Sequence, residues 1–460
     1  MTAARTVIPP ATKGQPAGPA LRRWPPLLAG VLAWAATAAL IGLLGYTAIR
    51  HPPYLTDLRV YRTAGRDVLA GRPVYRPVPR ARLASLGRSY LVFTYPPFAA
   101  LLAVPLALVS WRAAEIAWIP VVYGSLAIVV RLAFAPLLAA AGRWRAAAFG
   151  AVTGACALMW PLLQEIRFGQ VDMALAALCT LDVATRRPRW PRGLLVGLAT
   201  AIKLTPGAFL AYLLITGRRR AALTAAAAAG GATLAAWALL PSASAFYWST
   251  ALWHTRRLGR PGQVSDQSIQ AMLIRAFAPA PVPRALWLLL ALAAAAAGLA
   301  AARAASRRGN EMAAIAIVGL ASVLASPVSW IHHIVWVVVA AGAILSDGRR
   351  AWRWLAALAT ADFFVFYDPY ALRRTWWSGY APHLIAQVRR DAYGIASAVL
   401  IAVLAALPRA ASRGGPAPAG RESAPPPPSG PAPGCSTAPD GSAPAVARGP
   451  GARDRPPGPR

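Results

Sequence analysis

The sequence is poor in cysteine, in lysine and in acidic residues. Its 460 residues include 3 Cys and 15 Asp and Glu, against 48 Lys and Arg. Cys156, Cys179 and Cys435 lack the spacing of a zinc site or a disulfide framework, which argues against both. The first two lie in apolar segments, where a free cysteine is ordinarily a small buried hydrophobe. Lysine occurs only at positions 13 and 203, so arginine carries nearly all of the net charge of +33.

Apolar sequence is what the chain has in abundance. It is 57% hydrophobic, in runs of roughly 17–25 residues that are long enough to cross about 30 Å of hydrocarbon as helix. A soluble helix would bury only one apolar face, and a signal peptide would explain only one such run. The composition therefore predicts an all-α polytopic protein of the plasma membrane.

Arginine clusters separate the apolar runs. Binding to nucleic acid would call for a continuous basic stripe along the phosphates, whereas short clusters between apolar runs are typical of cytoplasmic loops. The distribution indicates a membrane topology and no nucleic-acid partner. The clusters are Arg22–Arg23, Arg143–Arg145, Arg186–Arg192, Arg218–Arg220, Arg303–Arg308 and Arg349–Arg353.

The chain divides into a head, a membrane domain and a tail. Residues 1–20 and 409–460 are rich in Pro, Ala and Gly, and we expect both to be disordered because they cannot bury enough apolar surface to offset chain entropy. Residues 21–408 form the predicted membrane domain, with about 11–13 crossings, some of them broken or short. Residues 50–92 are its first outer loop, and the tail lies inside.

Three apolar segments have features that bear on the predicted topology. The run 93–110, which begins with FTYPPF, is among the predicted crossings. Residues 113–140 and 193–216 each have basic residues at both ends, although each looks like one crossing. Either each is a hairpin of two short helices, or one arginine cluster is on the other side of the membrane. Pro206, next to Lys203, favours a broken helix in the last segment.

Histidine and several aspartates gather on or beside the outer face of this topology, although arginine alone defined it. This clustering supports a site that faces outward. Short outer loops that are simply polar would give the same pattern, so this alternative stays open. The residues are His51, His254, His332, His333 and His383, with Asp57, Asp172, Asp266, Asp368 and Asp391.

Asp57 follows the first apolar run in the segment DLRVY, which places it within about one helical turn of Arg59 and Tyr61. A carboxylate at the membrane surface can act as a general base if its partners keep it ionised. The alternative is a residue that caps an interfacial helix. Tyr95, in FTYPPF, is either an interfacial aromatic or a ligand contact.

Lys203 is the only lysine in the membrane region. An unpaired cation at that depth costs at least about 2–3 kcal/mol, so it needs an anionic partner. A phosphate ligand and a neighbouring aspartate are the two candidates. Gln170 and Asp172 lie in FGQVD, where an outer loop returns to the membrane. Polar side chains there are often functional, although Asp172 could equally cap a helix.

Adjacent His332 and His333 lie in SPVSWIHHIVW. Side chains next to each other on a helix point about 100° apart, so both cannot face one site equally. No His or Cys lies at the spacing that a helical metal site needs, so we expect no metal. Hydrogen bonding to a polyhydroxylated or phosphorylated ligand fits better, with Trp330 and Trp336 as aromatic surfaces. Gln267 lies in SDQS of another outer loop.

Six segments in this order make the chain resemble glycosyltransferase family 87, the actinobacterial polyprenol-phosphate-mannose-dependent α-mannosyltransferases of the GT-C superfamily. The segments span residues 57–336, and each alone is weak evidence. They are DLRVYRTAGRDVLAGRPVY, FTYPPFAALLAVPLA, GQVDMALAAL, GLATAIKLTPGAFLAYLL, SDQSIQAMLIR and SPVSWIHHIVW.

The resemblance implies a GT-C-type fold and transfer of mannose from a polyprenyl-phosphate donor to a lipid-linked glycan, such as a phosphatidylinositol mannoside, on the extracytoplasmic face. We expect an inverting reaction without metal or cofactor. The resemblance implies that Asp57 is the catalytic base, and Lys203 with Arg59 would balance the charge on the leaving phosphate. It also implies that Gln170, Lys203, His332 and His333 line the substrate cavity. Further predicted substrate-binding residues are Tyr61, Tyr95, Asp172, Gln267 and Trp330.

Two other functions stay open. A transporter or lipid flippase would also have broken helices and a buried lysine, although its ionisable residues should follow a path through the bilayer. A non-catalytic membrane scaffold could bind partners through the tail. The chain also departs from the family, which usually has Asn at the position of Asp266 and often an acidic residue at that of Ile331.

Overall fold

The computed structural model describes residues 24–50, 55–75, 92–254, 262–368 and 380–408. Its contacts divide the chain into two units, Met1–Ala410 and Ala411–Arg460. The predicted head at 1–20 and tail at 409–460 lie outside the described residues.

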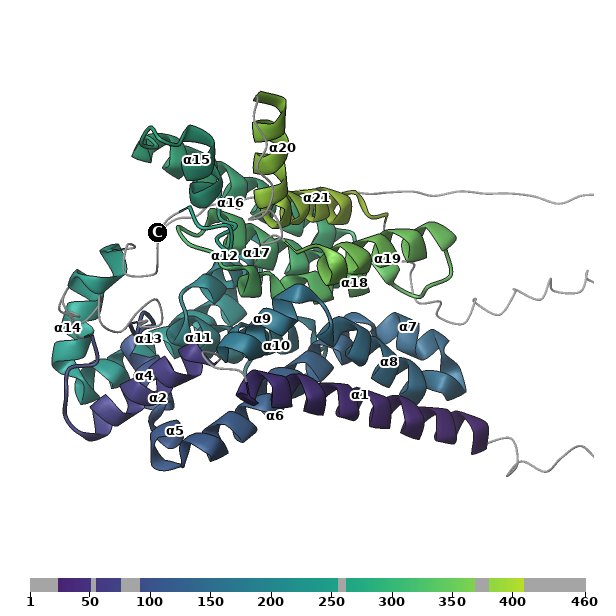
Figure 1. Ribbon diagram of the computed structural model, residues 1–460, viewed down its shortest axis with the longest axis horizontal. Helices are drawn as coiled ribbons and strands as arrows, with labels where there is room; N and C mark the ends of the chain where they lie inside the picture. Colours follow the sequence, from purple (N-terminus) through teal and green to yellow (C-terminus); the bar gives the residue numbers. More distant parts are fainter. Residues whose placement is uncertain (1–23, 51–54, 76–91, 255–261, 369–379, 409–460) are drawn as a thin grey trace, which may run out of the picture. The chain divides into compact units, whose positions relative to one another are not determined.

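The described chain is helical, and its one β-type contact is an isolated bridge between Asp266 and Trp330 (Figure 1). The α-helices are α1 (Trp24–Arg50), α2 (Thr56–Leu69), α4 (Pro97–Leu102), α5 (Val104–Leu108), α6 (Trp111–Ala133), α7 (Ala135–Ala140), α8 (Arg145–Ala157), α9 (Trp160–Phe168), α10 (Asp172–Ala184), α11 (Leu194–Ile202), α12 (Ala208–Ile215), α13 (Arg219–Leu239), α14 (Pro241–Ser249), α15 (Ile269–Phe277), α16 (Arg284–Arg307), α17 (Glu311–Ala325), α18 (Val337–Leu345), α19 (Ala351–Phe366), α20 (Tyr380–Arg390) and α21 (Ala392–Ala406). Short 3₁₀ helices are η2 (Gly142–Trp144), η3 (Thr205–Gly207), η4 (Ala251–Trp253) and η6 (Ile331–Trp336).

Among the described residues, 4 helices are long and apolar enough to cross a membrane, namely α1, α6, α13 and α16. Helices α8 and α9 add a fifth span if they are read together across their 72° bend. Large side chains of α1, such as Leu27 and Val31, are exposed, as expected where a helix faces lipid. The predicted all-α polytopic membrane architecture is confirmed. Several further apolar helices are shorter, so the predicted count of crossings stays a prediction.

Helices α1 and α8 run parallel. Gly30 packs against Ala146 and Gly154 packs against Thr37, so residue numbers rise together along the contact. Small residues allow the two backbones to approach closely. Both helices begin directly after an arginine cluster, and we call this end of the bundle the arginine-rich end.

Helix α6 runs in the opposite direction to α1. It begins where Trp111 lies under Arg59 and Arg62 of α2, beyond the far end of α1. Through α7 it leads to η2, which contacts α1 again. The segment 113–140 is therefore one crossing, and the arginine that precedes it, Arg112, lies away from the arginine-rich end.

The segment 193–216 is a hairpin of two short helices. Helices α11 and α13 are parallel, because Gly193 packs against Ala221 and Gly197 against Ala225. Residues 216–218 join α12 to α13. Helix α12 must therefore run back toward the end of the bundle at which α13 begins. The pair therefore enters from the arginine-rich end and returns to it. Lys203 lies at the turn, in extended conformation between the two helices.

The segment 93–110 does not form the predicted crossing. Helices α4 and α5 lie along α2, where the backbone of Ala103 passes directly over Gly65. The Arg62 guanidinium donates to the carbonyls of Leu106 at 3.0 Å and Val109 at 2.5 Å. Pro105, which has no backbone N–H to continue the preceding helix, falls at the start of α5. The prolines break this apolar run into pieces that are too short to span.

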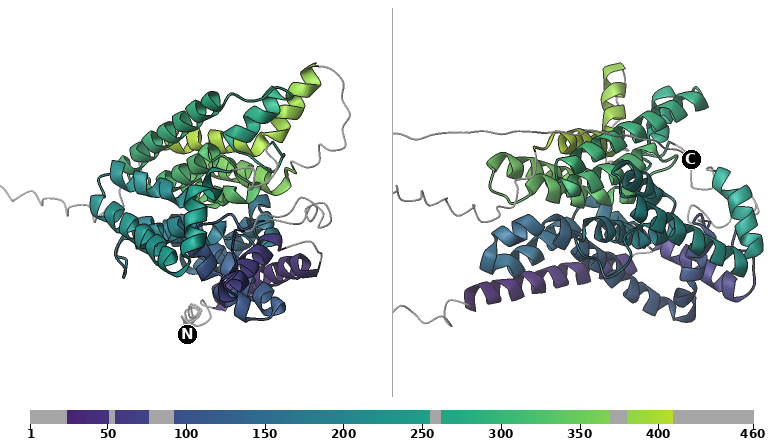
Figure 2. Two further views of the ribbon diagram at one scale, coloured as in Figure 1. Left: turned by 90° about the vertical axis from the view of Figure 1, so that its left-hand side faces the viewer. Right: turned by 180° about the vertical axis from the view of Figure 1, so that it is seen from behind.

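The core is built around α17 and α18, whose apolar side chains are buried almost throughout. A helix that is apolar on all sides belongs inside a bundle. These two helices fix both ends of the segment that carries the paired histidines. Helix α20, by contrast, stands out from its neighbours in Figure 1 and in both views of Figure 2.

Candidate active site

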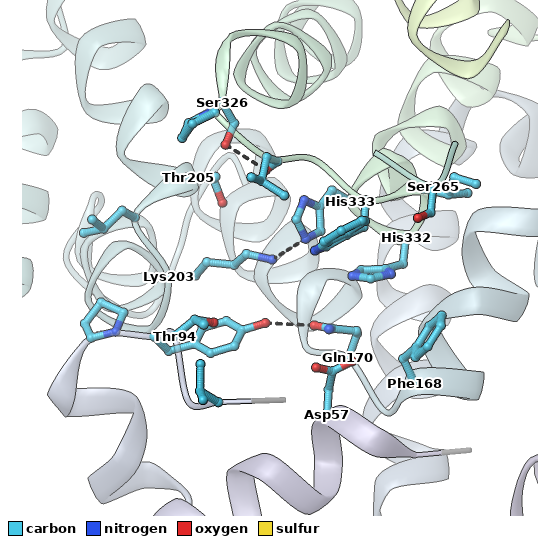
Figure 3. A pocket seen from close by; sticks show the side chains of 18 of the residues that line it. Asp57, Thr94, Phe168, Gln170, Lys203, Thr205, Ser265, Ser326, His332 and His333 are labelled. Carbon is cyan, nitrogen blue, oxygen red and sulfur yellow. Dashed lines mark hydrogen bonds between the residues drawn. The ribbon is translucent and has the colours of Figure 1, made fainter. Parts of the chain in front are cut away.

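A cavity of about 380 Å³ opens at the end of the bundle away from the arginine-rich end (Figure 3). It brings together side chains that are far apart in the sequence, and most of the predicted site residues are among them. The predicted residues in its lining are Asp57, Tyr95, Gln170, Lys203, Trp330, His332 and His333. Its apolar lining includes Val92, Pro96, Phe168, Leu204, Leu252, Val328 and Ile331.

Asp57 is held at the cavity by the junction of α2 with α9. The N–H of Leu55 donates to the Arg167 carbonyl at 2.6 Å. Gly169 ends α9 with a φ of +70°, and a Cβ at this position would lie only 2.6 Å from the Leu58 Cβ. Only glycine satisfies both the backbone angle and the contact. The turn therefore sets Gln170 beside the first turn of α2, where Asp57 lies.

The Gln170 side chain has a fixed orientation. Its Oε1 accepts hydrogen bonds from the hydroxyls of Tyr61 at 2.9 Å and Tyr95 at 2.8 Å. Because both hydroxyls donate to its Oε1, its NH₂ group is free to donate to the Asp57 carboxylate. Burial raises the pKa of Asp57 to about 7, while the Gln170 hydrogen bond and the charge of Lys203 act to lower it. A carboxyl group with such a pKa is suited to taking up a proton near neutral pH.

The anionic partner of Lys203 is a neighbouring aspartate, Asp172. Its Nζ donates to both carboxylate oxygens of Asp172, at 2.7 and 2.9 Å. It also lies 3.0 Å from His333 Nε2. An ammonium group can only donate, so His333 Nε2 accepts and the ring proton is on Nδ1. The Lys203 side chain also lines the cavity, so the ion pair does not remove it from reach of a ligand.

The paired histidines face the same cavity through different contacts. His333 turns its Nε2 to Lys203, whereas the His332 ring packs against Phe168 with 5.7 Å between the ring centres. They lie on the 3₁₀ helix η6 rather than on an α-helix. The expected difference in direction is present, yet both rings reach the cavity.

Asp172, His332 and His333 also form a group whose ligand atoms lie within 4.8 Å of one another. Such a set could hold a metal ion. The Lys203 ammonium, however, is bonded to both Asp172 oxygens and adjoins His333. A cation would have to displace it, so these residues do not fit a resident metal well. The expectation that the protein uses no metal stays a prediction.

Four predicted site residues are outside the cavity lining. Arg59 is exposed, with its guanidinium 4.5 Å from the Trp111 ring centre. Tyr61 and Asp172 lie behind Gln170 and Lys203, respectively. Gln267 is fully buried, and its amide is bonded to the backbone of Val264, Arg390 and Gly394. The structure gives Arg59 no contact with the cavity and gives Gln267 the role of joining loops.

Asp266 joins two loops that are far apart in the sequence. Its Oδ1 accepts from the N–H groups of Ser268 at 3.1 Å and Ser329 at 2.9 Å, and Gln267 N–H donates to the Ser329 carbonyl at 2.7 Å. This contact fixes the segment that leads into Trp330. An aspartate and an asparagine can both supply the accepting oxygen.

We therefore expect Asp266→Asn to keep the stability of the protein and Asp266→Ala to lower it. Removal of the acceptor leaves two buried N–H groups without a partner, at a cost of about 1–3 kcal/mol. The melting temperature of the detergent-purified variants measures this difference. Equal melting temperatures for the alanine and asparagine variants would contradict the joining role.

Gln164 and Glu165 were not among the predicted site residues. Gln164 lines the cavity. Glu165 is fully buried, and its Oε1 accepts from the Met173 N–H at 2.5 Å at the start of α10. The signal was available, because these two polar residues interrupt an otherwise apolar stretch, WPLLQEI. Buried polar residues in a membrane helix are costly and therefore informative.

A helical membrane protein with a carboxylate, a lysine and two imidazoles around one cavity fits the class of multi-pass membrane transferases. A match to a protein-family model identifies which family of transferases this is. The model of glycosyltransferase family 87 matches residues 93–327, and the chain belongs to this family. It is a membrane glycosyltransferase. The matched region includes Tyr95, Gln170 and Lys203, whereas Asp57 precedes it and the paired histidines follow it.

Curated relatives carry the comparison across most of the chain. A polyprenol-phosphate-mannose-dependent alpha-(1-2)-phosphatidylinositol mannoside mannosyltransferase of Mycobacterium tuberculosis is 35% identical over 332 residues, which are 70% of this chain and 77% of the relative. The protein of the same description from Mycolicibacterium smegmatis is 34% identical, over 73% of this chain and 80% of its own. A pentamannoside mannosyltransferase of Mycolicibacterium smegmatis is 29% identical, over 80% and 89%. No solved structure matches the chain.

Proposed function

We propose that the protein transfers mannose from a polyprenyl-phosphate donor to the glycan of a phosphatidylinositol mannoside-like acceptor, on the extracytoplasmic face of the plasma membrane. Asp57 is the general base, and the reaction inverts the anomeric centre. The relatives act on substrates of these kinds by name. The observation that carries the proposal is the presence of Asp57 and Lys203 in the lining of one cavity.

The two groups have complementary roles in one displacement. The acceptor hydroxyl oxygen forms a bond to the anomeric carbon of mannose while the bond from that carbon to the phosphate oxygen breaks. The hydroxyl proton passes to the Asp57 carboxylate, and the electron pair of the broken bond leaves on the polyprenyl phosphate. The Lys203 ammonium stabilises the charge that develops there. A single displacement without a covalent intermediate inverts the configuration.

The surroundings suit substrates that stay in the bilayer. The cavity has an apolar wall beside its polar groups, so a polyprenyl chain can lie among the helices while its phosphate meets Lys203. The cavity is at the end opposite the arginine-rich end. Under the positive-inside rule the arginine-rich end faces the cytoplasm, and this supports an extracytoplasmic site.

Transfer of label tests the function directly. Proteoliposomes that hold the purified protein receive polyprenol-phosphate-mannose labelled in the sugar, together with phosphatidylinositol mannosides. We expect label in a larger mannolipid, at a rate proportional to the protein. Label that crosses the bilayer on an unchanged carrier would identify a flippase. Label that neither moves nor changes carrier in the presence of these acceptors would contradict the proposal.

The pKa of Asp57 predicts how the rate depends on pH. Only the carboxylate accepts a proton, and burial raises its pKa to about 7, so kcat/KM should fall about tenfold per pH unit below that value. The same shift affects stability with the opposite sign. A carboxyl group with a raised folded-state pKa stabilises the protein most below its unfolded pKa, and this contribution is lost as the pH rises through about 7.

Initial rates between pH 5.5 and 8.5, about a unit and a half either side of that midpoint, measure the profile. Thermal melting at each pH serves as the control. Gln170→Leu should move the midpoint to higher pH, because it removes a hydrogen bond that lowers the pKa of Asp57. A flat profile in the wild-type protein would contradict the assignment of the base.

A further inference from the structure

One wall of the cavity has polar side chains without a hydrogen-bond partner among the described residues. Gln164 and His332 both line the cavity, and they are only 3% and 5% exposed. No hydrogen-bond partner of the Gln164 amide is found among the described residues, and His332 Nε2 is likewise without one. Buried polar atoms are ordinarily satisfied, so the unpartnered His332 Nε2 at a cavity indicates a missing partner, and the Gln164 amide is open to the same cavity.

The wall has a defined composition. Gln164 and Phe168 lie four residues apart on α9 and so share one face of the helix. That helix packs against η6, which brings His332 against Phe168. We call Gln164, Phe168 and His332 the α9 wall. It offers a neutral amide, an imidazole and an aromatic ring, and it includes no charged side chain.

These groups match a carbohydrate better than a phosphate. A side-chain amide donates and accepts at once, as the hydroxyls of a sugar do. An aromatic ring covers the apolar C–H face of a pyranose. An anion would instead be drawn to Lys203. In Figure 3, Phe168 lies across Asp57 and Gln170 from Lys203, whereas His332 lies beside His333, whose Nε2 is 3.0 Å from the Lys203 Nζ.

We propose that the α9 wall binds the terminal sugar of the acceptor and determines which hydroxyl is presented to Asp57. This inference rests on the proposed function. In an in-line displacement the anomeric carbon lies between the leaving phosphate oxygen and the attacking hydroxyl. With the phosphate at Lys203 and the base at Asp57, the acceptor ring extends beyond Asp57 on the side away from Lys203. Phe168 of the α9 wall lies on that side in Figure 3, and Gln164 shares the same face of α9.

Steady-state kinetics of Gln164→Leu test the inference. The assay uses labelled polyprenol-phosphate-mannose as donor and a short-chain alkyl mannoside as acceptor probe. We expect the acceptor KM to rise about tenfold, as the loss of one or two hydrogen bonds predicts, and the donor KM to stay within about twofold. Gln387→Leu is the matched control, because Gln387 lies on α20 and is not in the cavity lining.

Monodeoxy analogues of the same mannoside sharpen the result. One analogue should lose about tenfold in kcat/KM with the wild-type protein and lose nothing further with Gln164→Leu, because the partner is already gone. The comparison is a ratio within each variant, so a smaller amount of folded protein cancels. If Gln164→Leu cannot be purified, His332→Asn takes its place.

The possible outcomes distinguish the inference from its alternatives. A rise in the donor KM alone would assign the wall to the donor sugar and overturn the inference. Unchanged constants for both substrates would overturn it as well. Failure of the wild-type protein to label any mannoside or phosphatidylinositol mannoside would instead refute the proposed function itself.

Discussion

Asp57→Asn is expected to lower the transfer rate about 1,000-fold while leaving the protein folded. Asparagine has the same shape but cannot take up the acceptor proton. Its burial should not harm the fold, because burial already disfavours the charged form of Asp57 and raises its pKa. The Asn side chain can still accept a hydrogen bond from Gln170. Transfer of labelled mannose by equal amounts of folded protein measures the effect.

Asp67→Asn is the matched control for this prediction. Asp67 lies on the same helix, α2, and its carboxylate is 2.8 Å from Arg72 Nε. It is not in the cavity lining, so we expect transfer within about threefold of wild type, because residues remote from the chemistry act only through stability. A rate for Asp57→Asn that matches the wild type would refute the base. An equal loss in both variants would show that charge on α2, and not proton transfer, matters.

The helices of this fold could be predicted from the sequence, whereas which of them cross the membrane and which turn back could be predicted only in part. Long apolar runs define α1 and α16 because length alone decides whether a helix can span the hydrocarbon. The short runs do not carry that information. The segment 93–110 lies along α2 because its prolines divide it, and 193–216 turns back at Lys203 because Gly193 and Gly197 allow α11 to pack parallel to α13.

The members of the site could be predicted better than their partners. The position of Lys203 in the membrane region predicted an anionic partner, because a buried cation without one is costly. The choice of Asp172 depends on packing between segments 31 residues apart, and the contact with His333 joins positions 130 residues apart. Local sequence cannot select among several aspartates at such distances. Gln267 and Arg59 show the converse, since motif membership did not reveal that one joins loops and the other lies outside the cavity.

Lys203→Met is expected to reduce both stability and activity, and a second substitution separates the two effects. Removal of the ammonium leaves the Asp172 carboxylate buried without its partner, at a cost of about 3–5 kcal/mol in the free energy of unfolding. The double variant Lys203→Met with Asp172→Asn removes both charges. It should regain most of the melting temperature, because no uncompensated charge remains.

Activity should not return with stability. The double variant has no cation to stabilise the departing polyprenyl phosphate, and we expect kcat to stay about 100- to 1,000-fold below wild type. Melting temperatures and the transfer of labelled mannose by the same purified samples make the comparison. Asp172→Asn alone keeps the cation and should retain far more activity than the double variant. A double variant that regains both stability and rate would show that Lys203 serves only to neutralise Asp172. Recovery of stability without recovery of rate would show that Lys203 has a second role besides pairing with Asp172, as expected if it stabilises the leaving phosphate.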